Sequence, residues 1–209
     1  MTLDTYQHRY DPPQGQSAWT ILLLHGTGGS ENDLIQLGQV LLPGAGLLSP
    51  RGQVGEGGAL RFFRRHAEGV LDQEDLAARS SEMSDWVESA AAHYGFDPRR
   101  VIAAGFSNGA NLAASMLLRG MDLPVAAVLL SPMLPFEPEN DPDLSGRNVF
   151  VGAGRVDPLV PTQQVDALES VLSRSGASVE VFWMPGGHGI TTDEVRAAST
   201  WLARVIDAS

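Results

Sequence analysis

Ser107 stands in a pattern that is typical of a nucleophile. It is the central residue of Gly105–Gly109, which fits the spacing G-x-S-x-G between the apolar run Val101–Ala104 and a helical stretch that begins near Asn108. A serine on such a strand-to-helix turn is lifted clear of the sheet, and the glycines remove side chains that would collide with the backbone. A turn that merely joins the two elements is the alternative. The context favours a nucleophilic serine.

A serine hydroxyl is a weak nucleophile near neutral pH, so a general base must accept its proton during attack. His188 lies in the glycine-rich segment Pro185–Gly189, directly after an apolar strand, and is our candidate for that base. A purely structural loop histidine is the alternative. His25 ends the first strand, where the neighbouring glycines indicate a backbone role. The other three histidines lie in less suitable segments and are His8, His66 and His93.

The base needs a carboxylate that holds its tautomer and stabilises the imidazolium. Asp157 follows the expected strand Val149–Val151, so that nucleophile, acid and base succeed one another along the chain. Asp141 and Asp143 are rivals, but they precede that strand in a proline-rich connection where solvated turn residues are common. A loop-capping role is the alternative for Asp157.

Attack on a carbonyl places negative charge on its oxygen, which backbone N–H groups can stabilise. The glycine-rich turn His25–Gly29 follows the first strand. We expect an oxyanion hole formed by the amides of Thr27 and of Asn108, the residue after the nucleophile. A plain turn is the alternative interpretation of the glycines.

Strands that alternate with helices must position these residues. Short apolar runs predict strands, and apolar residues at helical spacing predict helices. Ser30 or Asn32 is expected to cap the first helix. Residues 51–70 show no clean periodicity, which predicts a long loop. This order indicates an α/β fold, a mostly parallel sheet with helices on both faces, in a single domain over residues 1–209. The expected strands are Trp19–Leu24, Ala45–Leu48, Val101–Ala104, Val125–Leu130, Val149–Val151 and Val179–Met184. The first expected helix ends near Val40, and the other four are Gln73–Tyr94, Ser107–Leu118, Thr162–Arg174 and Thr192–Ile206.

The sequence does not match the residue spacing of common nucleotide-binding and metal-binding motifs. A dinucleotide fingerprint that starts at Gly26 meets Glu31 where it needs glycine, and one that starts at Gly152 meets Asp157. The sequence also lacks G-x-x-x-x-G-K-[ST] and H-E-x-x-H. We therefore expect neither a cofactor nor a metal.

The amino-acid composition excludes some classes of binding partner and of chemistry. The 25 acidic and 14 basic residues give a formal charge of -11, which repels phosphate backbones and makes a nucleic-acid partner unexpected. There is no cysteine, and therefore no disulfide framework or cysteine nucleophile. Because neither a secretory signal nor an apolar run of membrane-spanning length is visible, we expect a cytoplasmic protein without membrane insertion.

Together these motifs resemble the phospholipase/carboxylesterase family of α/β-hydrolases, which includes acyl-protein thioesterases, over the chain from Trp19 onward. They are most similar to a bacterial branch described as hydroquinone-specific hydrolases. The motifs that carry this resemblance are Leu24–Gly29, Ser49–Gly52, Arg61–Arg65, Gly105–Ala110 and Gly152–Asp157.

The resemblance implies the same site as the residues do: Ser107 as nucleophile, Asp157 as acid, His188 as base, and the amides of Thr27 and Asn108 as oxyanion donors. Many family members carry glutamine at the position of Asn108, so side-chain contacts to the substrate are expected to differ here. The family also implies a possible homodimer.

Residues that contact the substrate are sought in the arginine-rich loop. We expect Phe62 and Phe63 to line a cleft, because two large rings in a loop have no sheet core to complete. Arg61, Arg64 and Arg65 surround them, and we hypothesise that Arg64 and Arg65 hold an acidic group of the substrate. Bracing of the loop by ion pairs with nearby acidic residues such as Glu56 or Glu68 is the alternative.

The sequence therefore predicts a serine carboxylesterase that cleaves small or medium acyl esters, with a small-molecule ester as its partner. A thioesterase or lysophospholipase is a second hypothesis, separated from the first by leaving atom and chain length. A noncatalytic binding module on the same fold is a third, and it requires one of the three polar residues to be misplaced.

Overall fold

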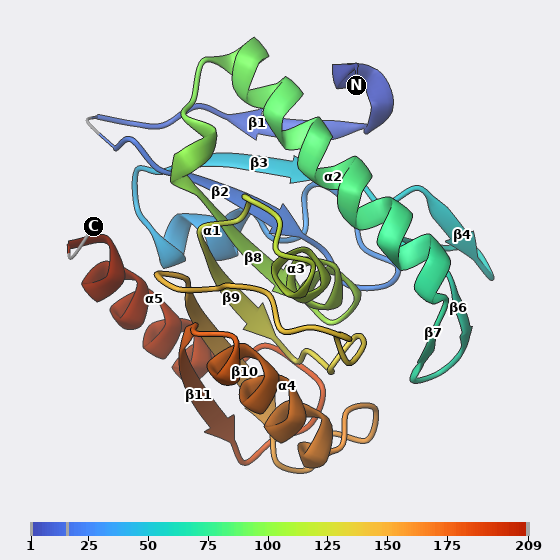
Figure 1. Ribbon diagram of the computed structural model, residues 1–209. Coiled ribbons are helices and arrows are strands. Elements are labelled where there is room, and N and C mark those ends of the chain that lie inside the picture. Colours follow the sequence, from blue (N-terminus) through green and yellow to red (C-terminus); the bar gives the residue numbers. More distant parts are fainter. Residues whose placement is uncertain (1, 16, 208–209) are drawn as a thin grey trace.

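The computed structural model describes residues 2–15 and 17–207, and its centre is a sheet of seven strands (Figure 1). These strands are β1 (His8–Asp11), β2 (Thr20–Leu24), β3 (Gly46–Pro50), β8 (Val101–Phe106), β9 (Ala126–Leu130), β10 (Asn148–Gly154) and β11 (Ser178–Met184). Their order across the sheet is β1-β3-β2-β8-β9-β10-β11. Only β1 runs antiparallel to its neighbour, so the predicted mostly parallel sheet is confirmed.

The inner strands are continuous apolar runs because helices cover them on both faces. Every residue of β2 and of β9 is buried. A strand in a parallel sheet that is covered on both sides has no solvent face, so its sequence does not alternate between polar and apolar residues. This property made the inner strands visible in the sequence.

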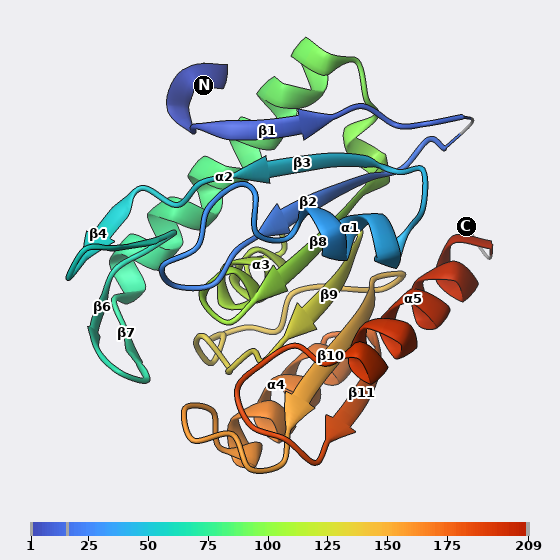
Figure 2. The ribbon, with the colours of Figure 1, turned by 180° about the vertical axis from the view of Figure 1, so that it is seen from behind.

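Helices lie on both faces of the sheet, as predicted. Figure 2 shows α1 (Ile35–Leu41) and α5 (Thr192–Asp207) on one face, and Figure 1 shows the other three helices on the opposite face. Each face has its own cluster of buried apolar side chains. The three helices of the second face are α2 (Gln73–Tyr94), α3 (Asn108–Leu118) and α4 (Thr162–Arg174).

Local signals at its ends fix the longest helix, α2. The carboxylate of Asp72 accepts a hydrogen bond from the amide of Asp75 at 3.0 Å, which caps the first turn. Gly95 ends the helix with a φ of 79°, a left-handed conformation that glycine adopts without strain. Two short 3₁₀ helices, Leu3–Thr5 and Pro98–Arg100, complete the helical elements of the described residues.

The prediction for the first helix was wrong at its beginning. Neither Ser30 nor Asn32 caps it, and α1 begins only at Ile35. The hydroxyl of Ser30 instead donates to the carboxylate of Asp33 at 2.7 Å within a turn that precedes the helix. The polar residues there stabilise this turn and leave the helix shorter than expected.

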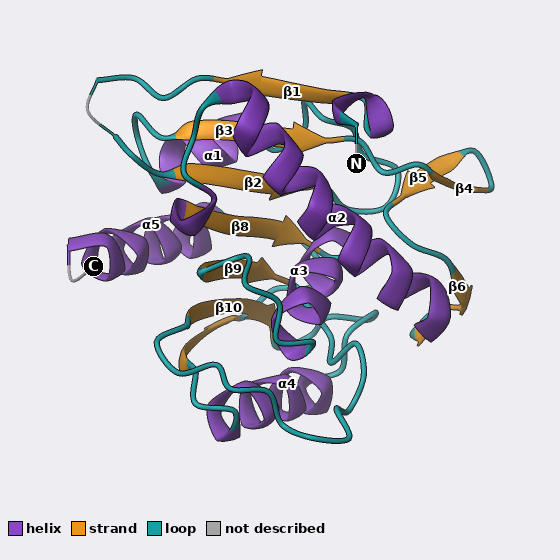
Figure 3. Cartoon of the chain, turned by 45° about the horizontal axis from the view of Figure 1, so that its top comes forward, coloured by secondary structure: helices purple, strands orange, loops and turns teal. Residues whose placement is uncertain are grey.

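The predicted long loop over residues 51–70 was also wrong. This segment forms two small antiparallel hairpins outside the main sheet (Figure 3). Strands of two or three residues are too short to show periodicity in a sequence. The hairpin strands are β4 (Val54–Glu56), β5 (Ala59–Arg61), β6 (Arg65–Ala67) and β7 (Val70–Leu71).

Among the described residues, no helix has both the length and the apolar character that a membrane span requires.

Candidate active site

Ser107 occupies a strained turn between β8 and α3. Its φ is 50° and its ψ is -111°, a conformation that residues with a side chain rarely adopt. A Cβ atom on Gly105 would lie 2.6 Å from the amide nitrogen of Ala110, and one on Gly109 would lie 2.0 Å from the carbonyl oxygen of Leu24. Both glycines are therefore required, and the strand-turn-helix motif predicted from the sequence is present.

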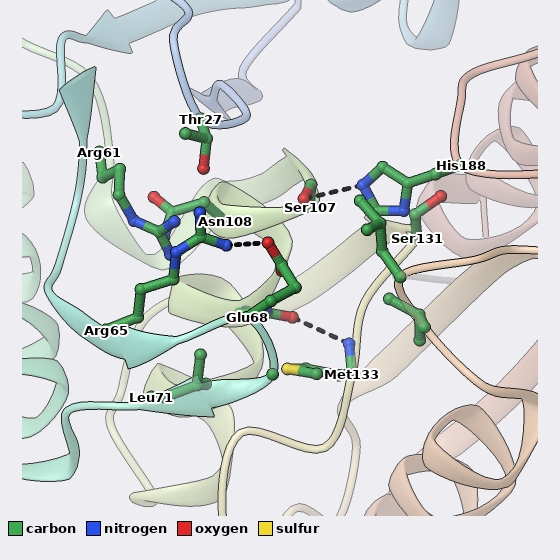
Figure 4. Close-up of a pocket in the computed structure, with 14 residues that line it drawn as sticks. Thr27, Arg61, Arg65, Glu68, Leu71, Ser107, Asn108, Ser131, Met133 and His188 are labelled. Carbon is green, nitrogen blue, oxygen red and sulfur yellow. Dashed lines mark hydrogen bonds and ion pairs between the residues drawn. The ribbon is translucent and has the colours of Figure 1, made fainter. Parts of the chain in front are cut away.

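The structure brings Ser107, His188 and Asp157 into one hydrogen-bonded chain. Nε2 of His188 lies 2.9 Å from Oγ of Ser107, and Nδ1 lies 2.7 Å from Oδ2 of Asp157 (Figure 4 shows the first bond). Because a carboxylate can only accept, Nδ1 carries the proton and Nε2 is free to accept from the serine. The side chain of Asp157 is only 2% exposed.

Backbone amides hold the Asp157 carboxylate in place. Its Oδ1 accepts hydrogen bonds from the amide of Leu159 at 2.8 Å and from that of Val160 at 3.0 Å. The carboxylate therefore has two roles, since it caps its own loop through Oδ1 and orients His188 through Oδ2. The loop-capping alternative and the acid prediction do not exclude each other.

Gly154 allows the loops that carry Asp157 and His188 to meet. These loops follow β10 and β11, two neighbouring parallel strands. A Cβ atom on Gly154 would lie 2.4 Å from the carbonyl oxygens of both Gly186 and Gly187. Any larger residue at this position would push the His188 loop away from the carboxylate.

Thr27 and Asn108 line the pocket that contains Ser107, on the side opposite His188 (Figure 4). Asn108 is the first residue of α3, so its amide has no acceptor within the helix. The turn that bears Thr27 is fixed by the amide of Gly28, which donates to the carbonyl of Leu60 at 2.8 Å. This placement is compatible with an oxyanion hole, whose two amides remain a prediction.

His25 links backbone segments. Its Nδ1 lies 2.7 Å from the carbonyl oxygen of Gly26, and its Nε2 accepts a hydrogen bond from the amide of Gly52 at 2.9 Å. Burial lowers the pKa of His25, which favours the neutral ring that these two bonds require. The structure agrees with the backbone role that the sequence indicated.

The prediction that Phe62 and Phe63 line a cleft was wrong. The two side chains are 1% and 0% exposed and belong to the apolar core on the α2 and α3 side of the sheet. The ring of Phe62 packs 4.6 Å from that of His25, centroid to centroid. Neither residue lines the pocket that contains Ser107.

Arg64 does not face the pocket, which corrects one half of the arginine hypothesis. Its side chain is 58% exposed, and its ion pairs reach Asp72 at 3.0 Å and Asp75 at 3.4 Å, at the beginning of α2. Arg65 does line the pocket, together with Arg61. Arg64 precedes β6, and Arg65 is the first residue of that strand.

Several pocket residues were missed by the sequence analysis. Asn111 lies one helical turn after Asn108, and its Oδ1 accepts a hydrogen bond from the amide of Met133 at 2.9 Å. Ser131 directly follows β9, and sheets of this type place functional residues at such strand ends, which is the signal that could have found it. The other lining residues not predicted are Glu68, Gly69, Leu71, Leu159 and Val160.

The pocket is small. Its cavity volume is about 30 Å³, whereas pockets that enclose a drug-sized ligand typically measure roughly 300–1,000 Å³. Only a few atoms of a substrate fit between Ser107 and the surrounding walls. A larger substrate must extend through the opening.

Comparison with known proteins agrees with the class that the fold and the site define, a hydrolase built on a mostly parallel α/β sheet. Residues 77–188 match the family described as alpha/beta hydrolase fold. MhqD of Bacillus subtilis (strain 168) is 44% identical over 200 residues, which cover 96% of this chain and 99% of that protein. The chain therefore belongs to the α/β-hydrolase family.

Solved structures give the same result. The carboxylesterase of Bacillus cereus superimposes with a TM-score of 0.94 at 39% identity, over 96% of this chain and 95% of that chain. A carboxylesterase from Mesorhizobium loti has a TM-score of 0.85 at 31% identity, over 90% of each chain. These relatives confirm the resemblance to the phospholipase/carboxylesterase family drawn from the sequence motifs.

Proposed function

We propose that the chain is a serine carboxylesterase in which Ser107 is the nucleophile. The observation that carries this proposal is the hydrogen-bonded chain from Ser107 through His188 to Asp157, at the wall of a pocket. Its similarity to two carboxylesterases above 30% identity supports the same reaction class.

The reaction follows from the positions of the donors. Nε2 of His188 accepts the hydroxyl proton while Oγ of Ser107 attacks the ester carbonyl, and Asp157 stabilises the resulting imidazolium. The amides of Thr27 and Asn108 stabilise the negative carbonyl oxygen on the other side of the serine. His188 then donates its proton to the departing alcohol, and a water molecule hydrolyses the acyl-enzyme by the same steps.

The small pocket favours short acyl groups. With a cavity of about 30 Å³ next to Ser107, a long acyl chain has no enclosed space along its length. We therefore propose small acyl esters as substrates. Thioester cleavage uses the same residues, and a comparison of oxygen and sulfur leaving groups on one acyl chain measures the preference.

The test is hydrolysis of 4-nitrophenyl acetate by the purified protein and by Ser107→Ala. We expect the variant to lose turnover by a factor of about 10³ or more, because only binding and oxyanion stabilisation remain. It should also fail to react with a fluorophosphonate probe while it keeps a cooperative unfolding transition.

The matched control is Ser81→Ala, which removes an exposed serine of α2 that does not line the pocket. It should keep wild-type turnover and labelling. Turnover by Ser107→Ala close to that of the wild type would contradict the proposal.

A further inference from the structure

Two arginines form one wall of the pocket that contains Ser107. Arg61 is the last residue of β5 and is almost completely buried, and Arg65 is the first residue of β6. Both lie on the same side of Ser107 as Thr27 and Asn108 (Figure 4). Cationic groups in a closed wall need anionic partners, because charge that is removed from water is costly.

Glu56 is shared between the two guanidinium groups. Its Oε2 lies 3.0 Å from Nη1 of Arg61, and its Oε1 lies 2.8 Å from Nε of Arg65. One carboxylate therefore serves two cations and leaves a surplus of one positive charge. Burial, followed by the charge of Arg65, lowers the pKa of Arg61, and the charges of Glu56 and Glu68 oppose this shift.

Glu68 supplies the second negative charge. It lies in the turn between β6 and β7, and its carboxylate forms an ion pair with Nη1 of Arg65 (Figure 4). Glu68 itself lines the pocket. A carboxylate of the protein thus lines the same pocket as Ser107, paired with an arginine of its wall.

The two glutamates differ in how firmly they are held. Glu56 contacts both arginines, whereas Glu68 contacts only Arg65; the side chain of Glu56 is 40% exposed and that of Glu68 is 57% exposed. Exposed ion pairs contribute little to stability, since water and ions compete for both partners. Another carboxylate can therefore replace Glu68 on Arg65 at small cost, while Glu56 keeps the arginines in position.

We propose that Arg65 binds a carboxylate carried by the ester substrate, in the place that Glu68 occupies in the free protein. This inference rests on the proposed esterase function and narrows its substrates to short esters that contain a free carboxylate. Because Arg65 and Ser107 line the same small cavity, we expect the carboxylate to lie only a few bonds from the ester carbonyl. Arginine suits this task because its planar group can bind a carboxylate through two hydrogen bonds.

The first test compares a charged ester with a neutral one of similar length. In the first pair, monoethyl succinate carries a carboxylate on its acyl part and ethyl pentanoate is its neutral counterpart. In the second pair, acetoxyacetate carries a carboxylate on its alcohol part and propyl acetate is its neutral counterpart. Proton release reports all four reactions. We expect higher kcat/KM for the charged member of one pair, and that pair identifies the part of the ester that Arg65 binds.

Substitutions at both partners of the ion pair sharpen the test. Arg65→Gln should raise KM for the preferred charged ester by about tenfold and by much less for its neutral counterpart. Glu68→Gln should lower KM for the charged ester, because Arg65 no longer has a competing carboxylate. Arg65→Lys keeps the charge, so it should retain the preference for the charged ester while weakening it.

Matched controls separate this effect from overall charge. Arg64→Gln removes an adjacent, exposed arginine that does not line the pocket, and Glu88→Gln removes an exposed carboxylate of α2. Neither should change the ratio of kcat/KM between charged and neutral esters. A shift by these controls equal to that of Arg65→Gln and Glu68→Gln would assign the effect to net charge and overturn the proposal.

Direct binding distinguishes failure of this inference from failure of the esterase function. Titration calorimetry should show that succinate binds the wild type and binds Glu68→Gln more tightly, and that neutral succinamide binds neither. Succinate binding without any Ser107-dependent hydrolysis would support the carboxylate site and contradict the esterase function. Hydrolysis with equal effects of Arg65→Gln on charged and neutral esters would mean that Arg65 only braces the hairpins.

Discussion

Ser131 carries backbone strain in the pocket wall. Among the described residues, it and Ser107 are the two non-glycine residues with positive φ, and the φ of Ser131 is 51°. Its hydroxyl is buried and has no hydrogen-bond partner among those residues. The amide of Ser131 donates to the carbonyl of Gly152 at 2.8 Å, so the sheet holds the residue in its strained conformation.

Replacement of Ser131 by two small residues should separate this strain from the hydroxyl. Ser131→Gly removes both, and Ser131→Ala removes only the hydroxyl. We expect the glycine variant to have a free energy of unfolding about 1 kcal/mol above that of the alanine variant, since glycine adopts positive φ without a steric cost. Urea denaturation measures the difference. Equal stabilities would show that the strain is negligible.

Ser107, His188 and Asp157 should behave as one unit in kinetics. His188→Ala and Asp157→Asn are each expected to slow turnover by about 10³-fold or more, and adding either to Ser107→Ala should lower the remaining rate little further. Turnover of an aryl ester by single and double variants measures this nonadditivity.

Asp143→Asn is the control, because Asp143 was a rival acid in the sequence. The structure places it in an exposed turn, where its Oδ1 accepts from the amide of Ser145 at 2.9 Å. We expect near-normal turnover. A severe loss in Asp143→Asn together with a mild loss in Asp157→Asn would move the acid to Asp143.

At the scale of elements, the sequence reveals what local patterns determine. Strands β2, β8 and β9 were predictable because their buried residues form unbroken apolar runs, and α2 because its apolar residues follow helical spacing up to a final glycine. Strand β1 was missed, since this edge strand has no fully buried residue and resembles a loop. Contacts between residues that are far apart in the sequence determine which segments form the walls of the pocket.

Two asparagines at the beginning of α3 illustrate such contacts. Oδ1 of Asn108 accepts from the amide of Phe62, 46 residues away, and Oδ1 of Asn111 accepts from that of Met133, 22 residues away. One helix therefore holds two walls of the pocket. No spacing rule in the sequence links residues so far apart, so the wall residue Glu68, which lies in a turn and not at the end of a main-sheet strand, could not be grouped with Ser107.

Asn111→Ala should loosen one of these walls. It leaves the buried amide of Met133 without its acceptor, which costs about 1–3 kcal/mol. We expect lower stability and faster amide hydrogen exchange at Met133. Asn140→Ala, at an exposed position of the same connection, is the control and should change neither. Unchanged exchange at Met133 in Asn111→Ala would show that other contacts hold the wall.

At the scale of the whole molecule, one buried carboxylate couples the stability of the fold to pH. Glu194 lies at the beginning of α5, is fully buried, and exchanges hydrogen bonds with Thr191: each accepts from the backbone amide of the other at 3.3 Å. Its Oε1 has no partner among the described residues. Burial raises the pKa of Glu194 to about 7.

The sign of this effect follows from linkage. A raised pKa in the folded state means that the unfolded chain releases this proton first, from about pH 4.5 upward. The favourable contribution of the protonated form is complete below that pH and is lost as the pH rises to about 7. Self-repulsion at a formal charge of -11 also disfavours the compact state, so the wild-type curve alone cannot isolate Glu194.

The variant Glu194→Gln isolates the contribution of the Glu194 carboxyl to the pH dependence of stability, because glutamine is also suited to the capping position and does not titrate. The difference in free energy of unfolding between the variant and the wild type should shift by about 2–3 kcal/mol in favour of the variant between pH 4.5 and pH 8. Taking a difference across pH cancels any constant packing cost of the amide. Asp193→Asn, an exposed neighbour in the same first turn, should shift by far less. Chemical denaturation at both pH values measures the shift, and equal shifts in the two variants would assign the effect to general repulsion.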